Sequence, residues 1–180
     1  HVGEKAFKAL PSFEGLPEAT VFGQSKRYPA YWAAMFNAML AHADETDDSH
    51  ETSITHPGCG IVPTAMAMSQ KEKKGGMDFI RAVCAGYDVG PRITEALGAM
   101  ALNNAGTSSH AMGAIFGSGA CASVLANFDG AQVRRLLSYL AHESSGLGCW
   151  MAEHDHVQKA YVFGAMGAKN AITSVLLVQS

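Results

Sequence analysis

Residues 113–128 read GAIFGSGACASVLANF and contain the spacing that decides the fold, because Gly113, Gly117 and Cys121 lie four residues apart. This spacing places the three small residues on one face of a helix. Each glycine inside a helix costs about 1 kcal/mol relative to alanine, so such a face is favourable only where another backbone approaches closely. The stretch therefore predicts an all-α fold, a helical bundle packed through small residues.

The rest of the chain carries further helical patterns, and strand patterns are nearly absent. Helices are predicted for residues 29–42, 63–74, 78–97, 131–147 and roughly 161–178. Residues 102–110, LNNAGTSSH, are expected to form a polar loop that ends in His110. Residues 1–28 contain several prolines and glycines and are predicted to be an irregular lead-in with at most one short strand. No domain boundary is visible, so we expect residues 1–180 to form a single all-helical domain.

The composition limits the possible functions. The chain has 180 residues, of which 48% are hydrophobic, and a formal net charge of -3. The negative net charge argues against binding of nucleic acid through a positively charged surface, and the sequence has no polybasic segment that would bind a membrane. The apolar runs 111–128 and 160–178 are not interpreted as transmembrane, because the first is short and the second has Lys169 at its centre. The four cysteines are far apart, which favours the cytoplasm or a mitochondrial matrix. The first residue is not methionine, and we expect the chain to be part of a longer sequence.

The most polar stretch is residues 42–60, HADETDDSHETSITHPGCG, which holds three histidines and five carboxylates. A long polar connection between apolar segments is often functional. The alternative is a solvated acidic loop that caps the next helix.

A metal site in this stretch was tested first and is not predicted. Nitrogen and oxygen ligands could come from His42, Asp44, Asp48 and His50. Their spacing matches neither H-E-x-x-H nor the calcium loop, which requires glycine at its sixth position. Residues 154–156, His-Asp-His, alternate too tightly for one helix face and are interpreted as a solvated loop. No G-x-G-x-x-G or P-loop occurs, so no cofactor is expected.

Acid–base chemistry fits the residues better. His56 and His110 each stand at the entry to a predicted helix, where the neutral imidazole needed by a general base is favoured. Lys159 also stands at a helix start, which disfavours a cation unless an anionic ligand binds there. The alternatives are structural histidines and a surface lysine.

Several motifs in order resemble the MmgE/PrpD family. They are NAMLAHADETDDSH at 37–50, THPG at 55–58, GYDVGPRI at 86–93, the loop histidine at 110, FGSGACAS at 116–123 and K-x-x-x-x-G from 159. The family includes 2-methylcitrate dehydratases, cis-aconitate decarboxylases and iminodisuccinate epimerases. The resemblance implies an all-helical domain whose active site is shared with a smaller α/β lid domain, usually in a homodimer. Family members are more than twice this length, so the lid domain is expected to be missing.

The resemblance also implies roles for five residues. His56, His110 and Lys159 would be catalytic, and Glu45, Ser49 and Lys159 would bind the substrate. Dehydratases and decarboxylases of the family usually have Asp and Thr in place of Glu45 and Ser49. The implied reaction is cofactor-independent dehydration, decarboxylation or epimerisation at a carbon next to a carboxylate of a small di- or tricarboxylate. The alternative is a non-catalytic helical module for binding or dimerisation, or an inactive fragment of such an enzyme.

Overall fold

The computed structural model describes all residues 1–180 and confirms the all-α class, with one sheet of two two-residue strands. The elements in chain order are α1 (Val2–Ala9), the 3-10 helix η1 (Leu10–Phe13), β1 (Ala19–Thr20), β2 (Arg27–Tyr28), α2 (Ala30–Ala41), α3 (Pro57–Lys71), α4 (Gly76–Leu97), α5 (Ala99–Asn104), α6 (Ser109–Leu125), α7 (Gly130–Glu143), the 3-10 helix η2 (Gly148–Ala152), α8 (Val157–Ala160), the π-helical turn η3 (Tyr161–Ala165) and α9 (Met166–Gln179).

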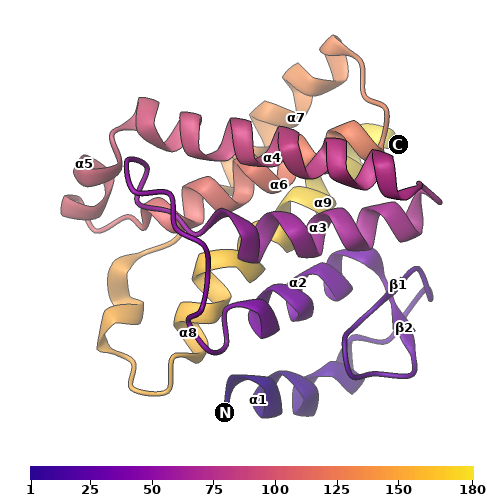
Figure 1. Ribbon diagram of the computed structural model, residues 1–180, viewed down its shortest axis with the longest axis horizontal. Helices are drawn as coiled ribbons and strands as arrows, with labels where there is room; N and C mark the ends of the chain where they lie inside the picture. Colours follow the sequence, from indigo (N-terminus) through magenta and orange to yellow (C-terminus); the bar gives the residue numbers. More distant parts are fainter.

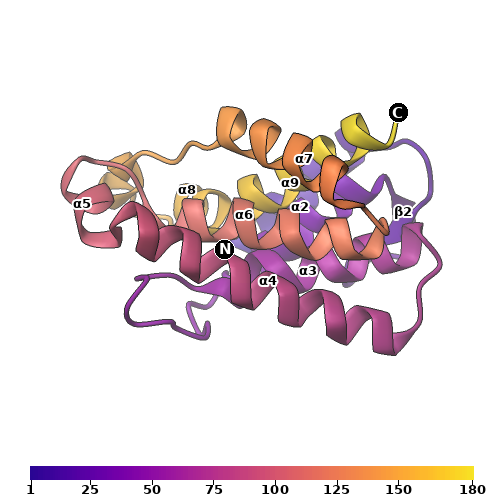
Figure 2. The ribbon, with the colours of Figure 1, turned by 90° about the horizontal axis from the view of Figure 1, so that it is seen from above.

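Helix α6 forms the centre of the bundle. It packs most extensively against α4 and also against α3, α7 and α9. Of its 17 residues, 14 are buried, as expected for a helix covered on all sides. Figure 2 shows α6 between α4 and α3 on one side and α7 and α9 on the other.

The close contact between α4 and α6 depends on glycines. A Cβ atom added to Gly90 would lie 2.6 Å from the carbonyl oxygen of Gly113, and one added to Gly86 would lie 2.9 Å from that of Gly117. Both distances are shorter than real Cβ contacts allow, so these positions tolerate no side chain. The prediction of a bundle packed through small residues is confirmed.

Three predicted boundaries were wrong. Residues 1–28 are not an irregular lead-in with at most one short strand, because α1 forms a short helix with a capping box between His1 and Glu4, and β1 pairs with β2. Helix α3 begins at Pro57, not at Pro63, which lies inside it. Both prolines suit a first helical turn, and the sequence pattern alone does not choose between them. Helix α5 interrupts the expected loop before His110, which itself lies in the first turn of α6.

The C-terminal segment α8–η3–α9 is long and apolar enough to cross a membrane by length and composition. However, 56% of its most apolar window is buried inside the protein. The segment packs against α2 and α6, so it behaves as a core helix of the bundle.

Candidate active site

The sequence-predicted site residues gather at one end of the long axis. There the polar loop between α2 and α3, helix α5, the start of α6 and the segment before α8 come together (Figures 1 and 2). The β1–β2 hairpin and the C-terminus lie at the other end.

The polar loop is anchored by a buried pair at its start. His42, which follows the last residue of α2, and Asp47 have side chains that are 1% and 4% exposed. Their Nδ1 and Oδ2 atoms are 2.7 Å apart. Burial raises the pKa of Asp47, but the hydrogen bond and the charge of His42 outweigh burial and lower the pKa below its usual value. Asp47 is therefore ionised at neutral pH.

The next residue, Asp48, orients His56. Its backbone carbonyl accepts a hydrogen bond from His56 Nδ1 at 2.8 Å, and its side chain accepts one from the backbone N–H of Gly58 at 3.0 Å. A carbonyl oxygen only accepts, so the neutral imidazole must carry its proton on Nδ1. The Nε2 atom then has the free lone pair. Ser49 Oγ lies 3.2 Å from the same Nδ1.

The imidazole ring of His110 stacks on the rings of His56 and Phe163. Its ring centroid is 4.6 Å from that of His56 and 3.9 Å from that of Phe163, with interplanar angles of 28° and 10°. Burial, followed by the nearby charges of His56, His42 and Lys159, lowers the pKa of His110 from 6.5 to about 3. His110 is therefore neutral throughout the physiological pH range.

The ring of Phe163 lies next to the histidines of the site and to Trp150. It lies in the π-helical turn η3, a geometry often found at functional sites. Its ring is 4.8 Å from that of His42, 5.8 Å from that of His56 and 4.8 Å from that of Trp150. Three histidines thus surround one buried aromatic ring.

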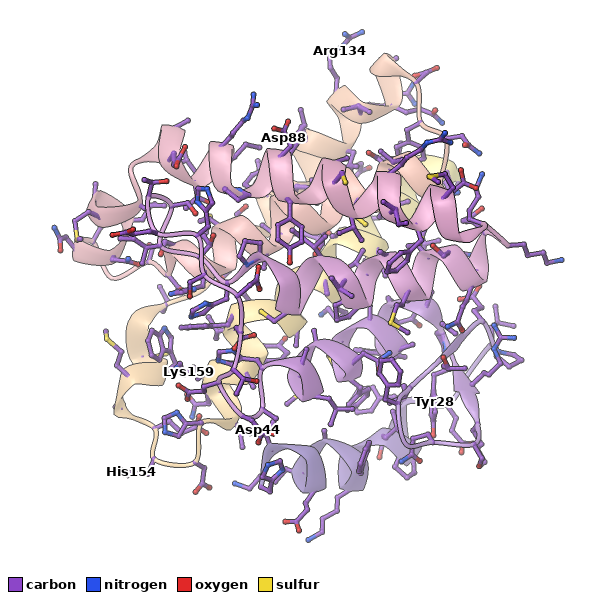
Figure 3. All side chains as sticks on the ribbon, in the orientation of Figure 1. Tyr28, Asp44, Asp88, Arg134, His154 and Lys159 are labelled. Atoms are coloured by element: carbon purple, nitrogen blue, oxygen red, sulfur yellow. The ribbon has the colours of Figure 1, made fainter.

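Lys159 approaches the same aromatic group from α8. Its ammonium lies 5.4 Å from the ring centroid of Phe163 and 5.6 Å from that of Trp150, within cation–π range. Its side chain is 16% exposed, and its Nζ atom is 2.6 Å from Glu45 Oε2. In Figure 3, Lys159 lies beside the loop that carries Asp44.

Glu45 also contacts His156, whose Nδ1 atom is 2.8 Å from Glu45 Oε1. The hydrogen bond from Lys159 is the main reason that the pKa of Glu45 is lowered. Both Glu45 and His156 have positive φ, at 52° and 56°. Non-glycine residues rarely adopt such angles, and they cluster at functional sites.

The predicted site residues form two adjacent groups. Ser49, His56 and His110 line one pocket of about 350 Å³, called here the histidine pocket. Glu45 and Lys159 do not line it, but they pair with each other next to Phe163.

Sequence reasoning missed His42 and Phe163 as parts of this site. The sequence marks His42 only as a possible metal ligand. A signal was present, because His42 follows the buried Ala34 and Ala38 at four-residue steps on α2. No comparable signal marked Phe163.

One cluster has the composition of a metal site. Ligand atoms of His42, Asp47 and Cys59 lie within 4.8 Å of one another. Two of these ligand atoms are already engaged, since His42 Nδ1 pairs with Asp47 and Cys59 Sγ donates to the His56 carbonyl at 3.2 Å, whereas His42 Nε2 has no partner. Burial raises the pKa of the Cys59 thiol far above its usual value, so it is not the thiolate that binds metals. These residues fit a hydrogen-bonded anchor better than a metal centre.

Comparison with known proteins identifies related sequences over the whole chain. The profile of the MmgE/PrpD N-terminal domain matches residues 1–180. A cis-aconitate decarboxylase-like protein, oryM, of Aspergillus oryzae is 28% identical over 98% of this chain and 37% of its own length. A cis-aconitate decarboxylase of Aspergillus terreus is 34% identical over 56% of this chain and 22% of its own length. The chain thus spans well under half the length of these relatives.

Proposed function

The chain belongs to the MmgE/PrpD family as its N-terminal domain, and from this premise we propose that it provides the acid–base half of an enzyme active site. The proposed substrate is a small di- or tricarboxylate, and the reaction occurs at a carbon next to a carboxylate. The likeness to cis-aconitate decarboxylases supports a lyase reaction, decarboxylation or dehydration, with epimerisation as a variant of the same proton chemistry.

The observation that carries this proposal is the orientation of His56. Its Nδ1–H is fixed by the Asp48 carbonyl at 2.8 Å, which leaves Nε2 as a base. In dehydration or epimerisation, Nε2 takes the proton as the C–H bond breaks, and the electron pair moves into the adjacent carboxylate. The imidazolium later returns the proton to carbon or to the leaving hydroxyl group. In decarboxylation the C–C bond to one carboxylate breaks instead, CO₂ leaves, and protonated His56 gives its proton to the carbon that keeps the electron pair. Such general catalysis contributes roughly 10²–10⁴-fold.

The other residues then have distinct roles. His110 is too weak a base to hold a proton at neutral pH, because its pKa is lowered to about 3. It acts instead as a neutral imidazole that stacks on His56 and forms a hydrogen bond with the substrate. The Ser49 hydroxyl donates to the substrate, and Lys159 binds a carboxylate when this carboxylate displaces Glu45 from its 2.6 Å contact.

The test is exchange of substrate C–H for C–D in D₂O. The 180-residue chain is incubated with succinate, citrate or cis-aconitate, and exchange next to the carboxylates is followed by proton NMR. We expect exchange above the buffer rate for at least one acid, and its loss in His56→Gln. Buffer-level exchange for every acid, or equal exchange in His56→Gln, would refute catalysis by this chain and leave the binding or dimerisation module, or an inactive fragment of such an enzyme, as the better account.

Assembly and compartment are part of the same proposal. Apolar side chains on α4 such as Met77 and Ile80 are 61% and 54% exposed, which supports a homodimer or contact with a further domain. All four cysteines are free thiols, which supports a reducing compartment such as the cytoplasm.

A further inference from the structure

A second pocket shares His110 with the histidine pocket. It is called here the α6 pocket, has a volume of about 270 Å³, and is lined among others by Asn103, Thr107, Ser108, His110 and Trp150. His110 also lines the histidine pocket, so the two pockets are neighbours. No residue in the lining of the α6 pocket is acidic.

Buried polar atoms without partners are concentrated in this lining. Six buried side-chain nitrogen or oxygen atoms in the protein have no hydrogen-bond partner, and three of them are Ser108 Oγ, His110 Nδ1 and Trp150 Nε1. Ser108 is only 3% exposed. A buried polar group without a partner is costly, so such a concentration points to a bound polar ligand.

The backbone adds further donors at the same place. Ser108 is the N-cap of α6, but its hydroxyl makes no capping bond. The Ser109 N–H donates to Asn103 Oδ1 at 3.0 Å. The N–H groups of His110 and Ala111 lie in the first turn, where no intrahelical acceptor exists, and they have no other partner. The positive end of a 17-residue helix dipole therefore borders the pocket.

These groups select the chemistry of the ligand. The Trp150 indole N–H and the backbone N–H groups only donate, and the Ser108 hydroxyl can donate. An anion with several acceptor oxygens satisfies all of them, and a carboxylate is the anion that the proposed substrate supplies.

We propose that the α6 pocket is a carboxylate subsite, which binds a second carboxylate of the substrate while the reacting carbon faces His56 in the histidine pocket. This inference rests on the proposed function for the identity of the ligand. One acid would then be held in two neighbouring pockets that share His110.

The experiment is an NMR titration of the ¹⁵N-labelled chain with succinate. The chain has two tryptophans, so Trp150 gives one of only two indole N–H signals. Trp32, whose ring packs 4.5 Å from that of Phe13, provides the internal control. We expect saturable shifts of the Trp150 indole and of the His110 and Ala111 amides, while Trp32 stays unchanged.

Two variants and a matched control test the contacts. Ser108→Ala should weaken succinate binding about tenfold, because hydrogen bonds to charged groups are the stronger kind. Trp150→Phe, read at the Ala111 amide, should weaken binding similarly while it retains the ring. Ser123→Ala removes a hydroxyl from the other end of α6, where it bonds to the Ala120 carbonyl, and should leave the affinity unchanged.

The outcomes separate this inference from the proposed function. Shifts at Ser49 and His56 without any at Trp150 would overturn the subsite and leave the proposed function standing. Shifts at Trp150 without C–H exchange would support an anion site and count against the enzyme. Equal affinity for inorganic phosphate would overturn the assignment to a carboxylate, and no shifts at all would overturn both proposals.

Discussion

The buried, neutral state of His110 predicts a specific loss of stability in acid. The folded protein lowers the pKa of His110 from 6.5 to about 3. Between these values the unfolded chain binds a proton that the folded chain does not, so the free energy of unfolding falls as the pH falls. The linkage relation gives a loss of about 2.5 kcal/mol between about pH 7.5 and about pH 4.5.

The assay is urea unfolding of the wild type and His110→Gln at both pH values. Glutamine keeps polar atoms at this position but does not titrate in this range. Effects of titratable groups that do not contact His110 are common to both proteins and cancel in the difference. We expect the wild type to lose about 2.5 kcal/mol more than the variant, with unchanged denaturant slopes. Equal losses in the two proteins would refute the view that His110 is held neutral.

Three further predictions concern packing, the lysine pair and assembly. Gly90→Ala should destabilise the protein by about 2 kcal/mol, because the new Cβ would lie 2.6 Å from the Gly113 carbonyl; Gly130→Ala, where nothing lies within 4 Å, is the control in thermal melts. Glu45→Gln should tighten succinate binding severalfold in calorimetry, because glutamine no longer competes as a charged partner for Lys159 at 2.6 Å; unchanged or weaker binding would contradict this. Light scattering after gel filtration should give a dimer or larger species, since α4 exposes apolar side chains; a monomer at every concentration would contradict it.

The sequence was most informative where a residue destabilises its own helix unless another backbone packs closely against it. Gly113 and Gly117 would weaken an isolated helix, so their spacing predicted the close approach that the structure has against α4. The start of α3 was less readable, because Pro57 and Pro63 both suit a first turn. The interior Pro63 shows that tertiary packing overrides this local preference.

The candidate site was only partly readable for a different reason. His56 and His110 were found because each stands at a helix entry, a local property of the sequence. The pairing of Glu45 with Lys159 joins residues 114 positions apart and depends on the packing of α8. The position of Phe163 depends on a π-helical turn that no periodicity marks. Such contacts arise from the tertiary fold and not from the local pattern.

The central claim is that His56 is the base, with Nδ1 protonated and Nε2 free. Long-range ¹H–¹⁵N correlation NMR of the histidine side chains measures this tautomer directly. We expect the Nδ1–H form for neutral His56, as its 2.8 Å contact with the Asp48 carbonyl requires. An Nε2–H tautomer would contradict it, because the nitrogen assigned to receive the substrate proton would already carry one.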